Sequence, residues 1–191
     1  LGMLAPAGLI LLLFVIFIND ITDHIDHEIT PKLYADDIKL YTRIETTTDI
    51  ALLQANLDYI VAWSKLWQME ISAAKCSILP IGGKLLCLHD RIYTLNNIIL
   101  PTVFNIRDLG ITVDQNLTFR NHVENIVSRA SIRSNLILRC FVSGERRLLL
   151  KAFTVYLRPI LEFDSCVWSP HFHQDIERLE SVQRRFTKRL S

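Results

Sequence analysis

Residues 33–41 read LYADDIKLY, where two adjacent aspartates, Asp36 and Asp37, interrupt a run of apolar and β-tolerant residues. This pattern predicts a strand, a tight turn and a second strand, with the carboxylates at the tip of the hairpin. Adjacent carboxylates repel each other and resist burial. A divalent cation would offset that cost, because Mg²⁺ prefers carboxylate oxygens and two such ions about 4 Å apart support in-line phosphoryl transfer. The alternative is an exposed Asp-Asp turn without a ligand.

Upstream of this stretch, residues 9–18 form the apolar run LILLLFVIFI, which ends at Asn19-Asp20. The run is shorter than the roughly 20 residues that a membrane-spanning helix needs. No Lys or Arg precedes Lys32, so the positive start of a signal peptide is missing. We therefore expect a buried core helix over residues 9–22, no membrane association, and an intracellular protein that is not secreted.

The cysteines support the same compartment. The four cysteines are Cys76, Cys87, Cys140 and Cys166. They show neither a Cys-x-x-Cys pair nor the spacing to histidine that zinc ligands have. This usage favours free thiols in a reducing environment and no disulfide-linked partner.

Downstream of the hairpin, Thr46-Thr47-Thr48-Asp49 offers helix caps, and apolar residues at helical spacing predict a helix to about residue 68. Strands are expected within residues 78–82, 91–100 and 106–113, with Asn96-Asn97 as a turn. From residue 121 the pattern becomes helical, over 121–141, 145–158 and 172–190. These expectations define an α+β fold, with a sheet-bearing part at residues 1–118 and a helical part at residues 119–191.

The net charge of +1 over 191 residues conceals an uneven distribution. Residues 1–90 carry 6 Lys and Arg against 11 Asp and Glu, whereas residues 91–191 carry 15 against 9. Basic helices can follow a phosphate backbone without reading bases, although an ordinary solvated helix face would look the same. The candidates for phosphate contact are four arginines of the helical part: Arg129, Arg133, Arg184 and Arg185.

Six blocks occur in an order that resembles the reverse transcriptases of non-LTR, LINE-type retrotransposons, most closely the jockey-like group. They are FVIFINDI (14–21), LYADDIKLY (33–41), WSKLWQMEISAAKCSILPIG (63–82), DLGITVDQNLTFRNHVENIVSRA (108–130), LLLKAFTVYLRPILEFDSCVWSP (148–170) and IERLESVQRRFTKRL (176–190). The resemblance implies part of a polymerase palm, with the YADD hairpin, a helix and primer-grip strands, followed by a thumb-like helical region. It also implies an RNA template, a DNA primer and two Mg²⁺ ions.

The resemblance assigns roles to single residues. Asp36 and Asp37 match the catalytic, metal-binding pair of the palm. Tyr34 and Ala35 match the positions beside the nucleotide and the primer end. Lys75 matches a lysine proposed to protonate the leaving pyrophosphate, although a solvated lysine at a helix end is an equal alternative. Leu109-Gly110 match the hairpin that holds the primer 3′ end.

Two features of the family's pattern are not found in these 191 residues. The family has a Pro-Gln-Gly-Ser segment before the apolar run, where this sequence has Ala5-Pro6-Ala7-Gly8, and it has a further catalytic aspartate on an earlier strand. We therefore expect this polypeptide by itself to lack polymerase activity. The alternative function is that of a catalytically dead nucleic-acid-binding or helical interaction remnant of a retrotransposon.

Overall fold

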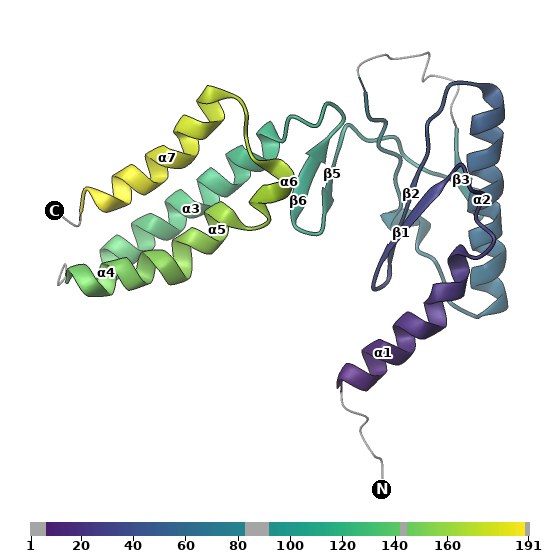
Figure 1. Ribbon diagram of the computed structural model, residues 1–191, viewed down its shortest axis with the longest axis horizontal. Helices are drawn as coiled ribbons and strands as arrows, with labels where there is room; N and C mark the ends of the chain where they lie inside the picture. Colours follow the sequence, from purple (N-terminus) through teal and green to yellow (C-terminus); the bar gives the residue numbers. More distant parts are fainter. Residues whose placement is uncertain (1–6, 83–91, 142–144, 190–191) are drawn as a thin grey trace, which may run out of the picture. The chain divides into compact units, whose positions relative to one another are not determined.

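The computed structural model describes residues 7–82, 92–141 and 145–189 (Figure 1). It is a mixed α and β structure, as expected, and its contacts divide the chain into two compact units. The first unit comprises Leu1–Ile78 and Leu86–Pro101, and the second comprises Leu79–Leu85 and Thr102–Ser191. This division falls before residue 118, because the last hairpin packs with the helices that follow it. Each unit is described by itself.

The first unit is built around the expected hairpin and the helix after it. Its elements are α1 (Ala7–Ile18), η1 (Asn19–Thr22), β1 (Thr30–Tyr34), β2 (Asp37–Tyr41), α2 (Thr47–Leu66), η2 (Ala73–Lys75), β3 (Thr94–Leu95) and β4 (Ile98–Ile99). Strands β1 and β2 pair antiparallel, as do β3 and β4.

Helix α2 begins where the sequence predicted it. The Thr46 side chain accepts a hydrogen bond from the Asp49 N–H, while the Asp49 carboxylate accepts one from the Thr46 N–H at 2.7 Å. This reciprocal arrangement is a capping box, which satisfies N–H groups that the first turn of a helix leaves unpaired. The Asn96-Asn97 turn between β3 and β4 is also confirmed, and both residues have positive φ, at 53° and 64°.

Two expectations about residues 9–82 are wrong. Helix α1 forms, but most of its described side chains are exposed, since only its C-terminal end reaches the core, where Phe14 and Ile18 pack with Ile60 and Trp63. The segment 78–82 is not a continuous strand: Ile78 forms an isolated bridge, donating its N–H to the Pro101 carbonyl at 2.9 Å, and Gly82 donates its N–H to the Gln115 carbonyl at 3.0 Å. Of the helices described, none combines the length and apolar character that crossing a membrane requires.

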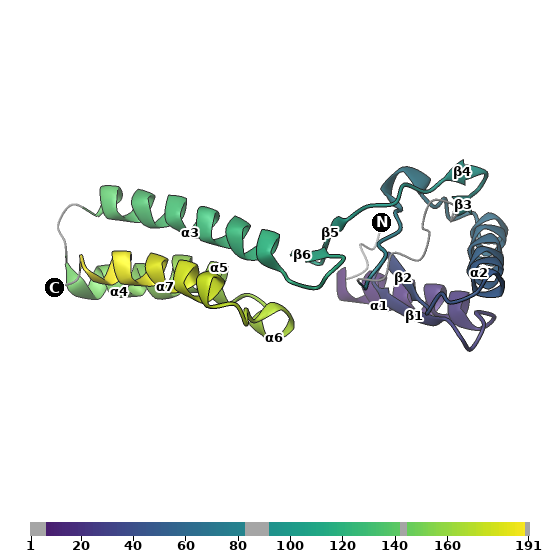
Figure 2. The ribbon, with the colours of Figure 1, turned by 90° about the horizontal axis from the view of Figure 1, so that it is seen from above.

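The second unit joins a hairpin to a group of helices (Figures 1 and 2). Its elements are β5 (Asn105–Asp108), β6 (Ile111–Asp114), α3 (Arg120–Cys140), α4 (Arg146–Ala152), the π-helical turn η4 (Phe153–Leu157), α5 (Arg158–Glu162), α6 (Ser165–Trp168) and α7 (His173–Thr187). The expected helices are therefore present, and the second of them continues through η4 and α5.

Helix α3 is the centre of the second unit, with α7 on one side and the α4–η4–α5 segment on another (Figure 1). Ala130 and Ile137 of α3 share a core with Val182 and Phe186 of α7. The buried carboxylate of Asp175, in the first turn of α7, lies 3.6 Å from Arg178. These contacts hold the basic helices in fixed positions.

Candidate active site and nucleic-acid surface

The two aspartates lie at the tip of the β1–β2 hairpin. The register pairs Tyr34 with Asp37, so Ala35 and Asp36 form a two-residue turn. Ala35 has a φ of 53°, which is uncommon for a residue with a Cβ atom. Both aspartate side chains are exposed. The turn therefore presents two adjacent carboxylates to solvent, at the cost of a strained alanine.

The hairpin has one apolar and one polar face because side chains alternate along a strand. Leu33, Ile38 and Leu40 point to the core and pack with the cluster that contains Trp63 of α2. Tyr34 and Asp37 lie on the opposite face, where the tyrosine side chain is 63% exposed. The packing of the apolar face thus fixes which way Tyr34 and Asp37 face.

Asp36 and Asp37 fit the expectation of metal ligands as far as their chemistry goes. Each provides carboxylate oxygens, the donors that Mg²⁺ prefers, and neither is buried away from solvent. Among the described residues, no group of three or more His, Cys, Asp or Glu side chains is close enough to hold a metal ion. Within the described residues, the hairpin tip thus presents a pair of carboxylates without a third such side chain beside them.

Lys75 belongs to the same unit and ends η2 with an exposed side chain. The segment before it is anchored through α2, where the Trp63 indole N–H donates to the Asp20 carboxylate at 3.1 Å. Asp20 comes from the FVIFINDI block, so this bond joins two of the blocks that the sequence singled out. Both the solvated and the functional interpretation of Lys75 agree with its exposure.

Leu109 and Gly110 form the two-residue turn between β5 and β6. Leu109 has a φ of 44° and Gly110 a φ of 95°, so both adopt the left-handed region. A Cβ atom at Gly110 would lie 3.3 Å from the ring of Phe163. The glycine therefore permits a close approach, and in this structure the approaching group is the Phe163 ring.

His122 ties this hairpin to α3. Its side chain is only 4% exposed, and its Nδ1 accepts a hydrogen bond from the Thr112 N–H at 3.2 Å. Burial lowers the pKa of His122 below its usual 6.5, and the positive charges of Arg129 and Arg107 lower the pKa further. Arg107 belongs to β5 of this hairpin, and Arg129 lies about two turns along α3 from His122. Arg107 is exposed and lies two residues before Leu109, so it is a further candidate for phosphate contact that the sequence pattern did not single out.

The four candidate arginines lie on two different surfaces of the second unit. Glu124 of α3 accepts from Arg178 of α7 at 2.7 Å, which marks the side of α3 that faces α7. At about 100° per residue, Arg133 lies about 180° around α3 from Glu124. Arg129 and Arg133 therefore face away from α7, whereas Arg184 and Arg185 belong to α7 itself. All four side chains are exposed.

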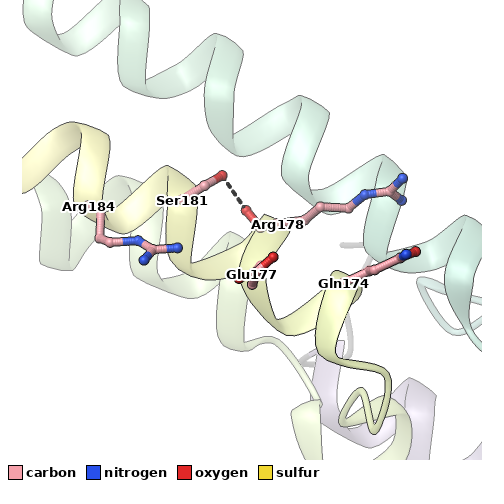
Figure 3. A pocket seen from close by; sticks show the side chains of 5 residues that line it. All are labelled: Gln174, Glu177, Arg178, Ser181 and Arg184. Atoms are coloured by element: carbon pink, nitrogen blue, oxygen red, sulfur yellow. Dashed lines mark hydrogen bonds between the residues drawn. The ribbon is translucent and has the colours of Figure 1, made fainter.

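Helix α7 also carries a polar hollow of about 560 Å³ (Figure 3). Its lining residues all come from this helix: Gln174, Glu177, Arg178, Ser181 and Arg184. The Ser181 hydroxyl donates to the Arg178 carbonyl at 2.7 Å, and the Arg184 guanidinium lies 4.0 Å from the Glu180 carboxylate. The hollow mixes both charges, so it does not form a purely basic groove.

Comparison with known proteins defines the class. Residues 5–113 match the family described as reverse transcriptase (RNA-dependent DNA polymerase). This segment covers more than half of the chain and contains the Asp36-Asp37 hairpin and nearly all of the β5–β6 hairpin. The chain belongs to the reverse transcriptase family.

Individual relatives narrow the type of reverse transcriptase. The chain is 24% identical over 181 residues to the RNA-directed DNA polymerase from mobile element jockey of Drosophila funebris, covering 91% of this chain and 19% of that protein. It is 26% identical over 163 residues to the probable RNA-directed DNA polymerase from transposon BS of Drosophila melanogaster, covering 83% and 18%. An uncharacterized protein, B0403.1 of Caenorhabditis elegans, is 31% identical over 85 residues, covering 44% and 43%.

These relatives support a fragment of a LINE-type reverse transcriptase, as the order of the blocks indicated. The chain spans about a fifth of the length of the curated transposon polymerases that it matches. No solved structure matches it.

Proposed function

We propose that this chain forms the C-terminal part of a reverse transcriptase palm, followed by a thumb. In this proposal the parent enzyme extends a DNA primer along an RNA template by phosphoryl transfer with two Mg²⁺ ions. The observation that carries the proposal is the family match over residues 5–113, within which two exposed carboxylates occupy a hairpin tip. The proposed thumb is the helical part, where exposed arginines lie on α3 and α7.

In this mechanism, Asp36 and Asp37 would hold the metal ions through their carboxylate oxygens at the exposed turn. Magnesium, when bound, would supply the positive charge that stabilises the attacking and leaving oxygens. Tyr34 lies beside Asp37 on the polar face of the hairpin and would contact the primer end. Lys75, if it reaches the leaving pyrophosphate, would donate a proton to it.

The 191-residue polypeptide by itself is proposed to be inactive. Asp36 and Asp37 need further ligands to hold two ions, and the described residues do not provide a third one nearby. Loss of a metal ligand and of nucleotide positioning each cost orders of magnitude in rate. Activity would therefore depend on residues from the rest of a longer polymerase.

A primer-extension assay with the purified chain tests this proposal. We expect no templated incorporation of deoxynucleotides. Incorporation that disappears in the Asp36→Ala variant would overturn the inactivity and would indicate that a second copy completes the metal site.

A chimaeric polymerase tests whether residues 9–113 can still support primer extension. Residues 9–113 would replace the matching segment of the jockey polymerase, and primer extension would be measured with and without Asp36→Asn. We expect extension that requires Asp36. A well-folded but inactive chimaera would favour the alternative function, a catalytically dead nucleic-acid-binding or interaction remnant.

A further inference from the structure

The polar face of the β1–β2 hairpin carries a pair of lysines behind the aspartates. The register places Lys32 directly opposite Lys39, one cross-strand pair along this face from Tyr34 and Asp37. The next pair on the same face is Thr30 with Tyr41. Lys32 is exposed and Lys39 is half-buried, while the rings of Tyr34 and Tyr41 are 63% and 46% exposed.

The hairpin packs against the core through its apolar face, opposite to the lysines. Leu33, Ile38 and Leu40 bury the other face against the core, and that burial holds the hairpin in place. Two lysines with exposed tyrosines on either side combine the positive charge and the aromatic rings that single nucleic-acid strands bind without regard to sequence.

We propose that Lys32 and Lys39 together bind a backbone phosphate of the nucleic-acid strand whose 3′ end lies at Asp36 and Asp37. This inference rests on the proposed function, because that function places the primer end at the hairpin tip. Two residues along a strand span about 7 Å, and one nucleotide of a duplex strand rises about 3.4 Å. The lysines would therefore meet the phosphate about two nucleotides behind the 3′ end.

The position also has an electrostatic reason. Asp36 and Asp37 repel the phosphates of any strand that approaches the tip, until metal ions neutralise them. Two ammonium groups one pair behind the carboxylates offset this repulsion on the same face, and they do so without contacting the reacting atoms. Lys32 and Lys39 are thus positioning residues for the primer strand.

The test measures binding of the 191-residue chain to a fluorescein-labelled primer–template duplex with a recessed 3′ end, by fluorescence anisotropy at several salt concentrations. The variant is Lys32→Gln/Lys39→Gln, and the control is Lys65→Gln/Lys151→Gln, which changes the net charge equally at exposed lysines on α2 and α4. If one phosphate contact is lost, affinity at 0.1 M salt falls about 8-fold and the slope of log K against log salt flattens by about 0.9. The control is expected to change affinity by less than about 2-fold.

A second duplex locates the contact. It carries one uncharged methylphosphonate linkage two nucleotides behind the primer 3′ end. We expect the wild-type chain to bind it about as weakly as the lysine variant binds the normal duplex, and we expect the lysine variant to lose nothing more. Equal additional losses in both proteins would overturn the proposed contact.

The remaining outcomes are also decisive. If the wild-type chain binds no duplex, the proposed function and the lysine contact both fail. If the wild-type chain binds and the lysine variant matches its control, only the lysine contact fails. If the melting temperature of the lysine variant falls while Lys32→Arg/Lys39→Arg restores stability but not binding, the lysines are structural and the proposal is overturned.

Discussion

Replacing Asp114 with alanine should loosen the connection between the β5–β6 hairpin and α3. The Asp114 carboxylate accepts hydrogen bonds from the backbone N–H groups of Asn116, Thr118 and Phe119 at 3.0, 3.2 and 2.7 Å, and from the Thr118 hydroxyl at 3.0 Å. Phe119, the residue directly before α3, has a φ of 55°, and its side chain makes no capping hydrogen bond. This single carboxylate therefore organises the turn that leads into the helix.

The size of the effect follows from these bonds. A hydrogen bond to a charged group contributes about 1.5–3 kcal/mol, but water can replace part of it at a half-exposed site. We therefore expect Asp114→Ala to lower the free energy of unfolding of the second unit by about 2–3 kcal/mol. Asp114→Asn keeps an acceptor oxygen and should cost about 1 kcal/mol.

The pH dependence gives an independent test of the same carboxylate. Burial alone would raise the pKa of Asp114, but the hydrogen bonds from Thr118, Phe119 and Asn116 bring the pKa below its usual 3.8. Near pH 3.8 the folded state then binds fewer protons than the unfolded state, so this stabilisation is present above that pH and is lost as the pH falls toward the lower, folded value. Asp114→Asn should lack this contribution.

Hydrogen exchange followed by mass spectrometry measures the prediction, because it reports on residues 114–126 even if the two units unfold separately. Faster exchange is expected in Asp114→Ala, and a smaller increase in Asp114→Asn. A change in unfolding free energy below about 0.5 kcal/mol, with unchanged exchange in this segment, would refute the role given to Asp114.

Three further predictions concern other parts of the second unit. Gly110→Ala should lower the free energy of unfolding by about 1–2 kcal/mol, because Gly110 has a positive φ and its Cβ would lie near the Phe163 ring. Thermal unfolding measures this change, and Gly8→Ala, at a position with open space around it, is the control. As the pH falls below about 6.5, His122 should destabilise the folded state, because burial lowers its pKa and its Nδ1 cannot accept from Thr112 once protonated. Urea unfolding should therefore give a smaller difference in unfolding free energy between pH 5 and pH 7.5 for His122→Gln than for the wild-type chain. An equal difference in the two proteins would contradict this. If about four phosphates are neutralised, log K for duplex binding should fall against log salt with a slope of about −3 to −4. That slope should flatten by several units in a variant with glutamine at Arg129, Arg133, Arg184 and Arg185, and it should stay constant in Asp36→Asn. An unchanged slope in the four-residue variant would mean that these arginines are only solvated surface.

Local features of this chain could be derived from the sequence. The capping box at Thr46 and Asp49 and the turn at Asn96-Asn97 depend on residues within four positions of each other. The alternation in LYADDIKLY likewise fixes which side chains share a face of the hairpin. The resemblance of the ordered blocks to reverse transcriptases added the family, which the match over residues 5–113 confirmed.

Contacts between distant residues were decided by the tertiary structure alone. The ten apolar residues 9–18 predicted a helix correctly and its burial wrongly, because burial depends on which elements cover a helix and not on its own composition. Thr112 meets His122 only after β6 and α3 have packed together, and Gly110 meets Phe163 only after the end of α5 has reached the β5–β6 turn. A strand or helix period specifies a face, but the partner of that face is chosen by packing between segments whose separation along the chain leaves no pattern in the sequence.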